Sequence, residues 1–281
     1  MSTDPVTTPR LFDRVLLVAR QRRAQVAGPV EFLLERVAED MDERLAAVNR
    51  RFVDVADIWT PGNGLRAPPQ AASFTRVALV DSPDEALPLA PGSLDLALSA
   101  LAFQFVNDLP GVLAQIRRAR KPDGLLLAAM IGGETLTELR QSFATAEAEC
   151  EGGISPRVAP FADLRDIGSL LQRADLALPV TDVDRITVRY ANAFALMADL
   201  RRMGATNIVL ERRRAPTRRA TLLRMAEIYA ERFADGDGRI RATFDIIWLS
   251  AWAPHESQQK PLKPGSATAS LEEAVKKAGK R

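Results

Sequence analysis

The stretch GSLDLALSALAFQFVNDLPGVLAQIRRARKPDGLLLAAMIGG (residues 92–133) predicts a parallel α/β sheet. It contains two short apolar runs, SLDLALSAL and GLLLAAMI, which are typical of strands buried on both faces. The segment between them predicts a helix that is capped by Asp108 and ended by Pro122 and Gly124. A strand, a helix and a second strand in this order form a βαβ unit, so we expect a doubly wound α/β sheet.

The same alternation continues on both sides of this unit. The runs RFVDVADI and TRVALVD predict earlier strands, and DVDRITVRY and RIRATFDIIWLSAWA predict later ones. We therefore expect an N-terminal helical segment over 1–50 and an α/β domain over 51–253. A helical insertion at about 191–235 precedes the last strand. The Pro-, Gly- and Ser-rich segment 254–281 predicts a mobile tail.

Composition excludes several classes of function. A formal charge of +2 over 281 residues gives no case for a nucleic-acid binder, and the basic run ERRRAPTRRATLLR (211–224) fits the solvated start of a helix better than an anionic docking patch. One cysteine and one histidine cannot form a disulfide, a Cys/His zinc site or a two-His-one-carboxylate iron site, so we expect no metal. The apolar runs are too short to span a membrane, and we see no signal peptide. Peripheral membrane contact stays open.

Residues 84–140 carry a family resemblance. Together with FVNDLPG and RRARKPDG, the motifs GGETLTELR and HESQQKP resemble class I S-adenosylmethionine-dependent methyltransferases over roughly residues 10–267. Within that superfamily they are similar to the group that joins the malonyl-carrier-protein methyltransferase of biotin synthesis to a mitochondrial complex I assembly factor, and more to the second branch. Alanine- and arginine-rich usage suggests a bacterial relative, so we expect a cytoplasmic location.

The resemblance implies a Rossmann-like sheet of seven strands, mostly parallel with the last strand antiparallel, and S-adenosylmethionine over the carboxyl ends of its first strands. One branch methylates a carboxylate, and the other is linked to hydroxylation of an arginine in a complex I subunit. We therefore expect a methyltransferase-like enzyme acting on a protein or carrier-bound substrate, with a respiratory complex I subunit as one candidate partner. The alternative is a catalytically silent assembly factor that has lost cofactor binding, since fold alone does not decide function.

The expected cofactor loop is shortened. The first strand ends near Asp57, and the turn TPGNG places Gly62 and Gly64 where the family has its glycine-rich turn. Only residues 58–75 separate Asp57 from Arg76, whereas a complete βαβ unit takes about 30 residues. The first βαβ unit is therefore predicted to be truncated, and its glycines could form a turn with or without a ligand.

The remaining candidates have competing interpretations. Asp81 is either the second-strand acid that holds a ribose or the end of the third strand; we favour the second identity, and a turn or cap is an equal alternative. Ser99 and Leu101 would line the floor of a cofactor pocket or belong to the sheet core. His255 and Glu256 are weak candidates for an acid–base pair. Catalytic residues are otherwise unassigned, because methyl transfer depends mainly on alignment.

Overall fold

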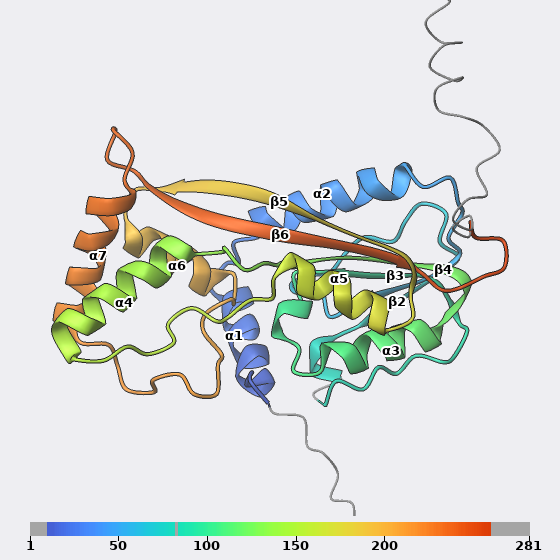
Figure 1. Cartoon of the computed structure of the whole chain (residues 1–281), viewed down its shortest axis with the longest axis horizontal. Coiled ribbons are helices and arrows are strands. Elements are labelled where there is room, and N and C mark those ends of the chain that lie inside the picture. Colours follow the sequence, from blue (N-terminus) through green and yellow to red (C-terminus); the bar gives the residue numbers. More distant parts are fainter. Residues whose placement is uncertain (1–9, 82–83, 260–281) are drawn as a thin grey trace, which may run out of the picture.

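The computed structural model describes residues 10–81 and 84–259. Its centre is a six-stranded sheet with the order β2-β1-β3-β4-β6-β5 (Figure 1). β1 to β4 are parallel, and β6 runs antiparallel to both β4 and β5. The strands are β1 (Asp54–Ile58), β2 (Ser73–Val77), β3 (Leu94–Ala100), β4 (Arg120–Ile131), β5 (Ala177–Tyr190) and β6 (Ile240–Trp252). The predicted mostly parallel sheet with an antiparallel last strand is confirmed, with six described strands instead of seven.

The unit predicted from residues 92–133 folds as expected. β3 and β4 are buried on both faces, and α3 (Leu109–Ala119) connects them. The Asp108 carboxylate accepts a hydrogen bond from the Gly111 N–H at 2.9 Å, which confirms the predicted helix cap. Val112 and Ile116 of α3 pack against the sheet together with Leu171 of α5 (Leu164–Arg173). α3 and α5 therefore cover one face of the sheet, and α2 (Phe32–Ala46) covers the other (Figure 1).

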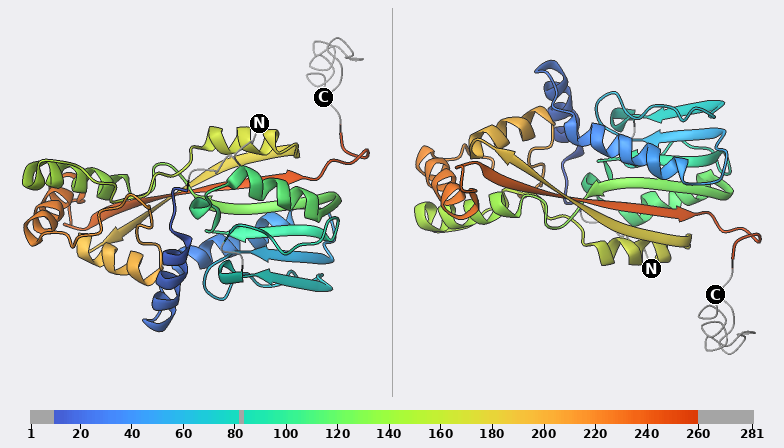
Figure 2. Two further views of the ribbon diagram at one scale, coloured as in Figure 1. Left: turned by 90° about the horizontal axis from the view of Figure 1, so that it is seen from below. Right: turned by 90° about the horizontal axis from the view of Figure 1, so that it is seen from above.

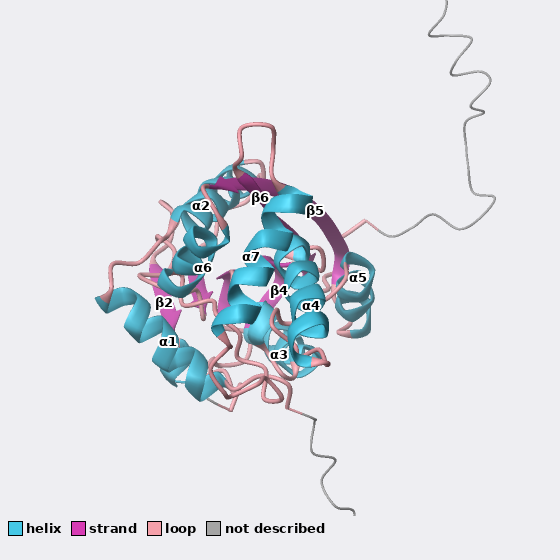
Figure 3. Cartoon of the chain, turned by 90° about the vertical axis from the view of Figure 1, so that its left-hand side faces the viewer, coloured by secondary structure: helices cyan, strands magenta, loops and turns pink. Residues whose placement is uncertain are grey.

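β5 and β6 pair with each other beyond the end of β4 and leave the sheet there as a two-stranded ribbon. Around the far end of this ribbon lie α4 (Thr137–Glu151), α6 (Ala193–Arg202) and α7 (Arg219–Phe233), as Figures 2 and 3 show. α6 and α7 are the helical insertion expected before the last strand. One hydrophobic cluster runs from Val37 and Leu98 through Phe244 to Phe143 and Ile228, so the sheet lobe and the helical lobe share a core.

The N-terminal segment is fastened to the sheet through the three tryptophans of the chain. The Arg14 guanidinium of α1 (Arg14–Val26) lies 4.4 Å from the centre of the Trp59 ring. Arg44 of α2 lies 4.2 Å from Trp248, and Arg50 lies 5.7 Å from Trp252. Guanidinium groups over indole faces are favourable cation–π contacts. Each of the three tryptophan rings is therefore in contact with an arginine from residues 1–50.

The first βαβ unit is truncated as predicted, and residues 59–72 contain no helix between β1 and β2. β2 pairs directly with β1, with Asp54 opposite Ser73. Residues 73–77 therefore lie beside β1, where the second strand of the family's sheet is expected. This corrects the favoured interpretation, in which Asp81 ends the third strand. A connection this short reaches only the neighbouring position in the sheet. Asp81 itself lies beyond the strand, in the 3-10 turn Leu79–Asp81.

The chain after β6 turns back on the sheet. The Gln258 side chain donates a hydrogen bond to Asp123 Oδ1 at 2.9 Å, and the His255 Nδ1 lies 2.7 Å from Ser257 Oγ. The larger part of the predicted mobile tail, residues 260–281, lies outside the described residues. Within residues 10–81 and 84–259, no helix has the length and apolar character needed to cross a membrane.

Candidate functional site

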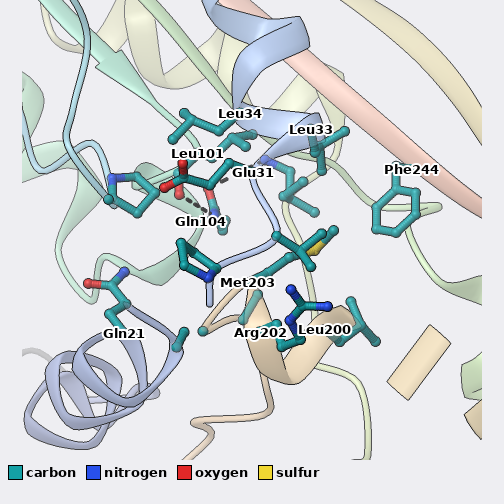
Figure 4. A pocket seen from close by; sticks show the side chains of 18 of the residues that line it. Gln21, Glu31, Leu33, Leu34, Leu101, Gln104, Leu200, Arg202, Met203 and Phe244 are labelled. Carbon is teal, nitrogen blue, oxygen red and sulfur yellow. Dashed lines mark hydrogen bonds between the residues drawn. The ribbon is translucent and has the colours of Figure 1, made fainter. Parts of the chain in front are cut away.

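A cavity lies where the parallel strands end, between the sheet and α6 (Figure 4). Its volume is about 100 Å³. Gly62 follows β1, Leu101 follows β3 and Ile131 ends β4, while Leu200 and Met203 close the opposite side. The carboxyl ends of parallel strands are where open α/β sheets bind ligands.

Three turns around this cavity have a strained backbone. Trp59 after β1, Leu101 after β3 and Leu136 after β4 adopt φ values of 61°, 52° and 55°. Residues other than glycine rarely adopt this left-handed conformation, which costs on the order of 1–3 kcal/mol. Strained residues concentrate at functional sites. Because these residues follow three neighbouring strands, they indicate that this edge of the sheet is the candidate functional site.

Asp57 organises the loop that follows β1. Its side chain is buried and accepts hydrogen bonds from the Thr60 hydroxyl and from the Leu65 N–H, the latter at 3.0 Å. The Thr60 oxygen in turn accepts the Ala100 N–H at 3.0 Å, which ties the loop to β3. Burial raises the pKa of Asp57, and the hydrogen bonds from Thr60 and Leu65 oppose that shift. The carboxylate is therefore used inside the protein to shape the loop.

The two loop glycines have different surroundings. A Cβ on Gly64, where φ is 73°, would lie 2.5 Å from Asp57 Oδ2 and 2.8 Å from the Arg76 guanidinium carbon. Arg76 also donates hydrogen bonds to the carbonyls of Thr60 and Gly62, and the half-buried Gly64 lines a separate pocket against α2. A Cβ on Gly62 would instead lie 2.6 Å from the Glu31 carboxylate. Gly62 therefore faces the cavity and Gly64 does not.

The lining of this largely apolar cavity includes six polar side chains: Gln21, Gln25, Glu31, Gln104, Thr135 and Arg202. Glu31 reaches it from the start of α2, and Gln104 reaches it from the turn after β3 (Figure 4). The Gln104 amide donates to the Leu101 carbonyl at 2.7 Å and accepts from the Ile131 N–H at 3.4 Å, so it joins the ends of β3 and β4. Gln104 had a signal in the sequence, since it is the one polar residue in the run AFQFV. Glu31 had none, because nothing local links it to Gly62.

The structure separates the six predicted cofactor-binding residues into groups. Gly62 and Leu101 line the cavity. Asp57 and Ser99 lie beneath it, and the Ser99 hydroxyl donates to the Ile58 carbonyl at 2.8 Å. Gly64 packs against Asp57 and Arg76 and lines the separate pocket against α2. Asp81 is exposed and is not among the lining residues.

His255 and Glu256 lie far from the cavity. The Ala253 N–H donates to the Gly124 carbonyl at 2.8 Å, which places this turn near the start of β4, whereas the cavity is at the end of β4. The structure therefore does not bring this pair together with the cavity residues. Among the described residues, no group of three or more His, Cys, Asp or Glu side chains is arranged to hold a metal ion.

Comparison with known proteins agrees with the geometry of this edge. Residues 36–128 match the family described as methyltransferase domain, and they contain β1, β2, β3 and most of β4. Residues 36–128 therefore resemble a methyltransferase domain. The predicted resemblance is thereby confirmed. A crystal structure from Bacillus halodurans designated a methyltransferase has a TM-score of 0.50 at 14% identity, covers 78% of this chain and 99% of its own, and shows the fold alone.

Curated relatives come from both branches. The chain is 48% identical over 176 residues to "Arginine-hydroxylase NDUFAF5, mitochondrial" of Dictyostelium discoideum, a match that covers 62% of this chain and 40% of the relative. It is 44% identical over 193 residues to the Homo sapiens protein of that name, covering 69% and 56%. It is 39% identical over 188 residues to the malonyl-[acyl-carrier protein] O-methyltransferase of Laribacter hongkongensis, covering 67% and 61%. The chain therefore spans 40–61% of the length of these relatives.

These relatives contradict the prediction of a bacterial cytoplasmic protein, which is wrong. The more similar branch consists of proteins whose names place them in mitochondria, in Dictyostelium, Danio rerio, Homo sapiens and Mus musculus. Alanine and arginine usage, on which the prediction was based, reflects base composition and mutation as much as location, so it did not carry this conclusion.

Proposed function

We propose that this protein is a methyltransferase-like enzyme of the complex I assembly-factor type, that it binds S-adenosylmethionine, and that it acts on a protein or carrier-bound substrate. The observation that carries the proposal is the cavity at the ends of β1, β3 and β4 with its three left-handed turns. The similarity to proteins named arginine-hydroxylase supports a protein side chain as the substrate.

The residues of the cavity fit this cofactor. Gly62 has no side chain, and the space that a Cβ would occupy there lies against the Glu31 carboxylate. The acid that holds the ribose hydroxyls in this family belongs to the end of the second strand, but Asp81 lies outside the cavity. Glu31 is the carboxylate that lines it. We therefore assign Glu31 the role of accepting hydrogen bonds from the cofactor's hydroxyl or ammonium groups.

The chain's own contribution is placement and shielding. Bound S-adenosylmethionine supplies a methyl group already activated by a sulfonium. Leu101, Leu136 and Phe244 present apolar walls that exclude water from the reacting centre. Gln104 fixes the separation of the β3 and β4 ends through its two backbone hydrogen bonds. Rigid placement of this kind supplies much of the rate enhancement for a transfer that needs no side-chain base.

Titration with S-adenosylmethionine in a calorimeter tests the proposal. We expect saturable binding, about tenfold weaker in Glu31→Gln, because one charged hydrogen-bonding partner is lost. Asp81→Ala should bind like the wild type, since Asp81 is exposed and outside the cavity. Glu35→Gln, an exposed acid one turn further along α2, is the matched control.

Two results would contradict the proposal in different ways. Absence of binding at millimolar ligand would exclude the cofactor and favour the silent assembly factor. Binding that is lost in Asp81→Ala but unchanged in Glu31→Gln would keep the cofactor and reject the role of Glu31.

A further inference from the structure

A second pocket adjoins the cavity and is not used by the proposed function. It lies between α1, α4, α6 and the loop that carries residues 211–217, and its volume is about 560 Å³. Phe105, Leu136, Phe161 and Leu200 belong to the walls of both spaces. The two pockets are therefore neighbours that share an apolar partition.

Arginine dominates the charge of this second pocket. Six arginines line it and no aspartate or glutamate does; they are Arg20, Arg157, Arg201, Arg212, Arg213 and Arg214. Three carboxylates lie behind them. Arg157 pairs with the buried Glu147, and Arg213 pairs with Glu151. Arg212 lies 3.5 Å from Asp13. Arg20, Arg201 and Arg214 form no ion pair with a described residue.

Arg20 lies among other cations at this pocket. Burial lowers the pKa of Arg20, the neighbouring cations Arg212 and Arg23 lower it further, and Asp13 opposes the shift. Within residues 10–81 and 84–259, the Arg20 guanidinium donates a hydrogen bond to the Asn207 carbonyl, which carries no counter-charge. Arg201 and Arg214 are exposed and form no ion pair with any described residue. Holding like charges at one concave site costs free energy that a bound anion would offset.

We propose that this basic pocket binds a phosphate monoester attached to an apolar body. A phosphate monoester carries about −1.5 to −2 charges at neutral pH, which matches three uncompensated arginines better than the single charge of a carboxylate. Guanidinium groups bind phosphate oxygens through paired hydrogen bonds. Leu139, Phe143 and Met197 supply apolar wall for the rest of the ligand. This inference stands on the pocket and does not depend on cofactor binding.

Hexyl phosphate is a soluble probe of this chemistry. In calorimetric titrations we expect saturable binding to the wild-type chain, and about tenfold or greater weakening in the double variant Arg201→Gln/Arg214→Gln. Neither arginine forms an ion pair with a described residue, so the variant should keep its thermal stability. Arg173→Gln/Arg219→Gln removes the same charge outside the pocket, and Arg173, like Arg201, lies in the last turn of its helix. This control should bind within about twofold of the wild type.

Two further measurements define the ligand. If the charge of the head group determines affinity, hexanoate should bind more weakly than hexyl phosphate. Sedimentation with phosphatidate-containing vesicles distinguishes a lipid source from a soluble one: binding lost in Arg201→Gln/Arg214→Gln points to a lipid headgroup, and absence of vesicle binding points to a soluble phosphate ester. The proposal is overturned if hexyl phosphate shows no saturable binding up to about 10 mM, or if the pocket variant and the control bind it equally.

Discussion

At the scale of single residues, Asp57 shows how a predicted ligand-binding acid is used by the fold itself. The carboxylate is buried, it accepts the Thr60 hydroxyl and the Leu65 N–H, and its pKa is raised by burial. A raised pKa means that the folded state binds the proton more tightly than the unfolded state does. Asp57 therefore favours folding most when it is protonated.

Because the pKa of Asp57 is raised, the effect of Asp57→Asn on the free energy of unfolding should depend on pH. The free energy of unfolding of the wild type minus that of the variant should be largest below the ordinary Asp pKa of 3.8 and should shrink as the pH rises through the raised pKa of Asp57. Urea titrations of both proteins across this range measure it, and the subtraction cancels the other carboxylates. A difference that grows with pH would contradict the assignment.

At the scale of elements, the loop over residues 59–72 replaces the helix of a complete βαβ unit. Its two glycines have positive φ, and Gly64 is packed against Asp57 and Arg76. Gly92 also has a positive φ, of 61°, but a Cβ there would meet no atom within 4 Å. Comparing substitutions at Gly92 and Gly64 therefore separates the cost of backbone strain from the cost of crowding around a new Cβ.

We expect Gly92→Ala to lower the free energy of unfolding by about 1 kcal/mol, through strain alone. Gly64→Ala should lower it by about 2–4 kcal/mol, because the new Cβ also displaces Asp57 or Arg76. Denaturant unfolding of both variants gives the comparison. Equal losses would mean that the loop moves aside at no cost and does not hold a fixed shape.

At the scale of the whole molecule, the sheet lobe and the helical lobe have one continuous core. Phe244 lies near its middle, is 2% exposed, and also lines the candidate cofactor cavity. Two lobes with separate cores could unfold independently, but a shared core couples them.

Scanning calorimetry of the wild type should therefore show one transition whose calorimetric and van't Hoff enthalpies agree. Phe244→Ala should cost about 3–5 kcal/mol and move that transition as a whole to lower temperature. The exposed Phe194→Ala is a control that should leave it within about 1 kcal/mol. Two resolved transitions in the wild type would show that the lobes unfold separately.

The parts of the fold that sequence reasoning predicted were those governed by local patterns. The strands and helix of residues 92–133 have clear periodicity and a capping Asp108, and the missing helix after β1 followed from counting residues. Contacts between distant segments could not be read in this way. The approach of Glu31 to Gly62, the placement of β2 beside β1, and the gathering of Arg20 with Arg201 and Arg212 all depend on tertiary packing.

The arginine–tryptophan contacts bear on how the chain is made. Arg44 and Arg50 leave the ribosome early, but their partners Trp248 and Trp252 are synthesised roughly 200 residues later. At about 5–20 residues per second, the first helices wait about 10–40 s for the strand on which they dock. During that interval the apolar side of α2, with Leu33, Val37 and Met41, lacks its completed sheet. The apolar side of α2 therefore stays incompletely covered during synthesis until the last strand is made.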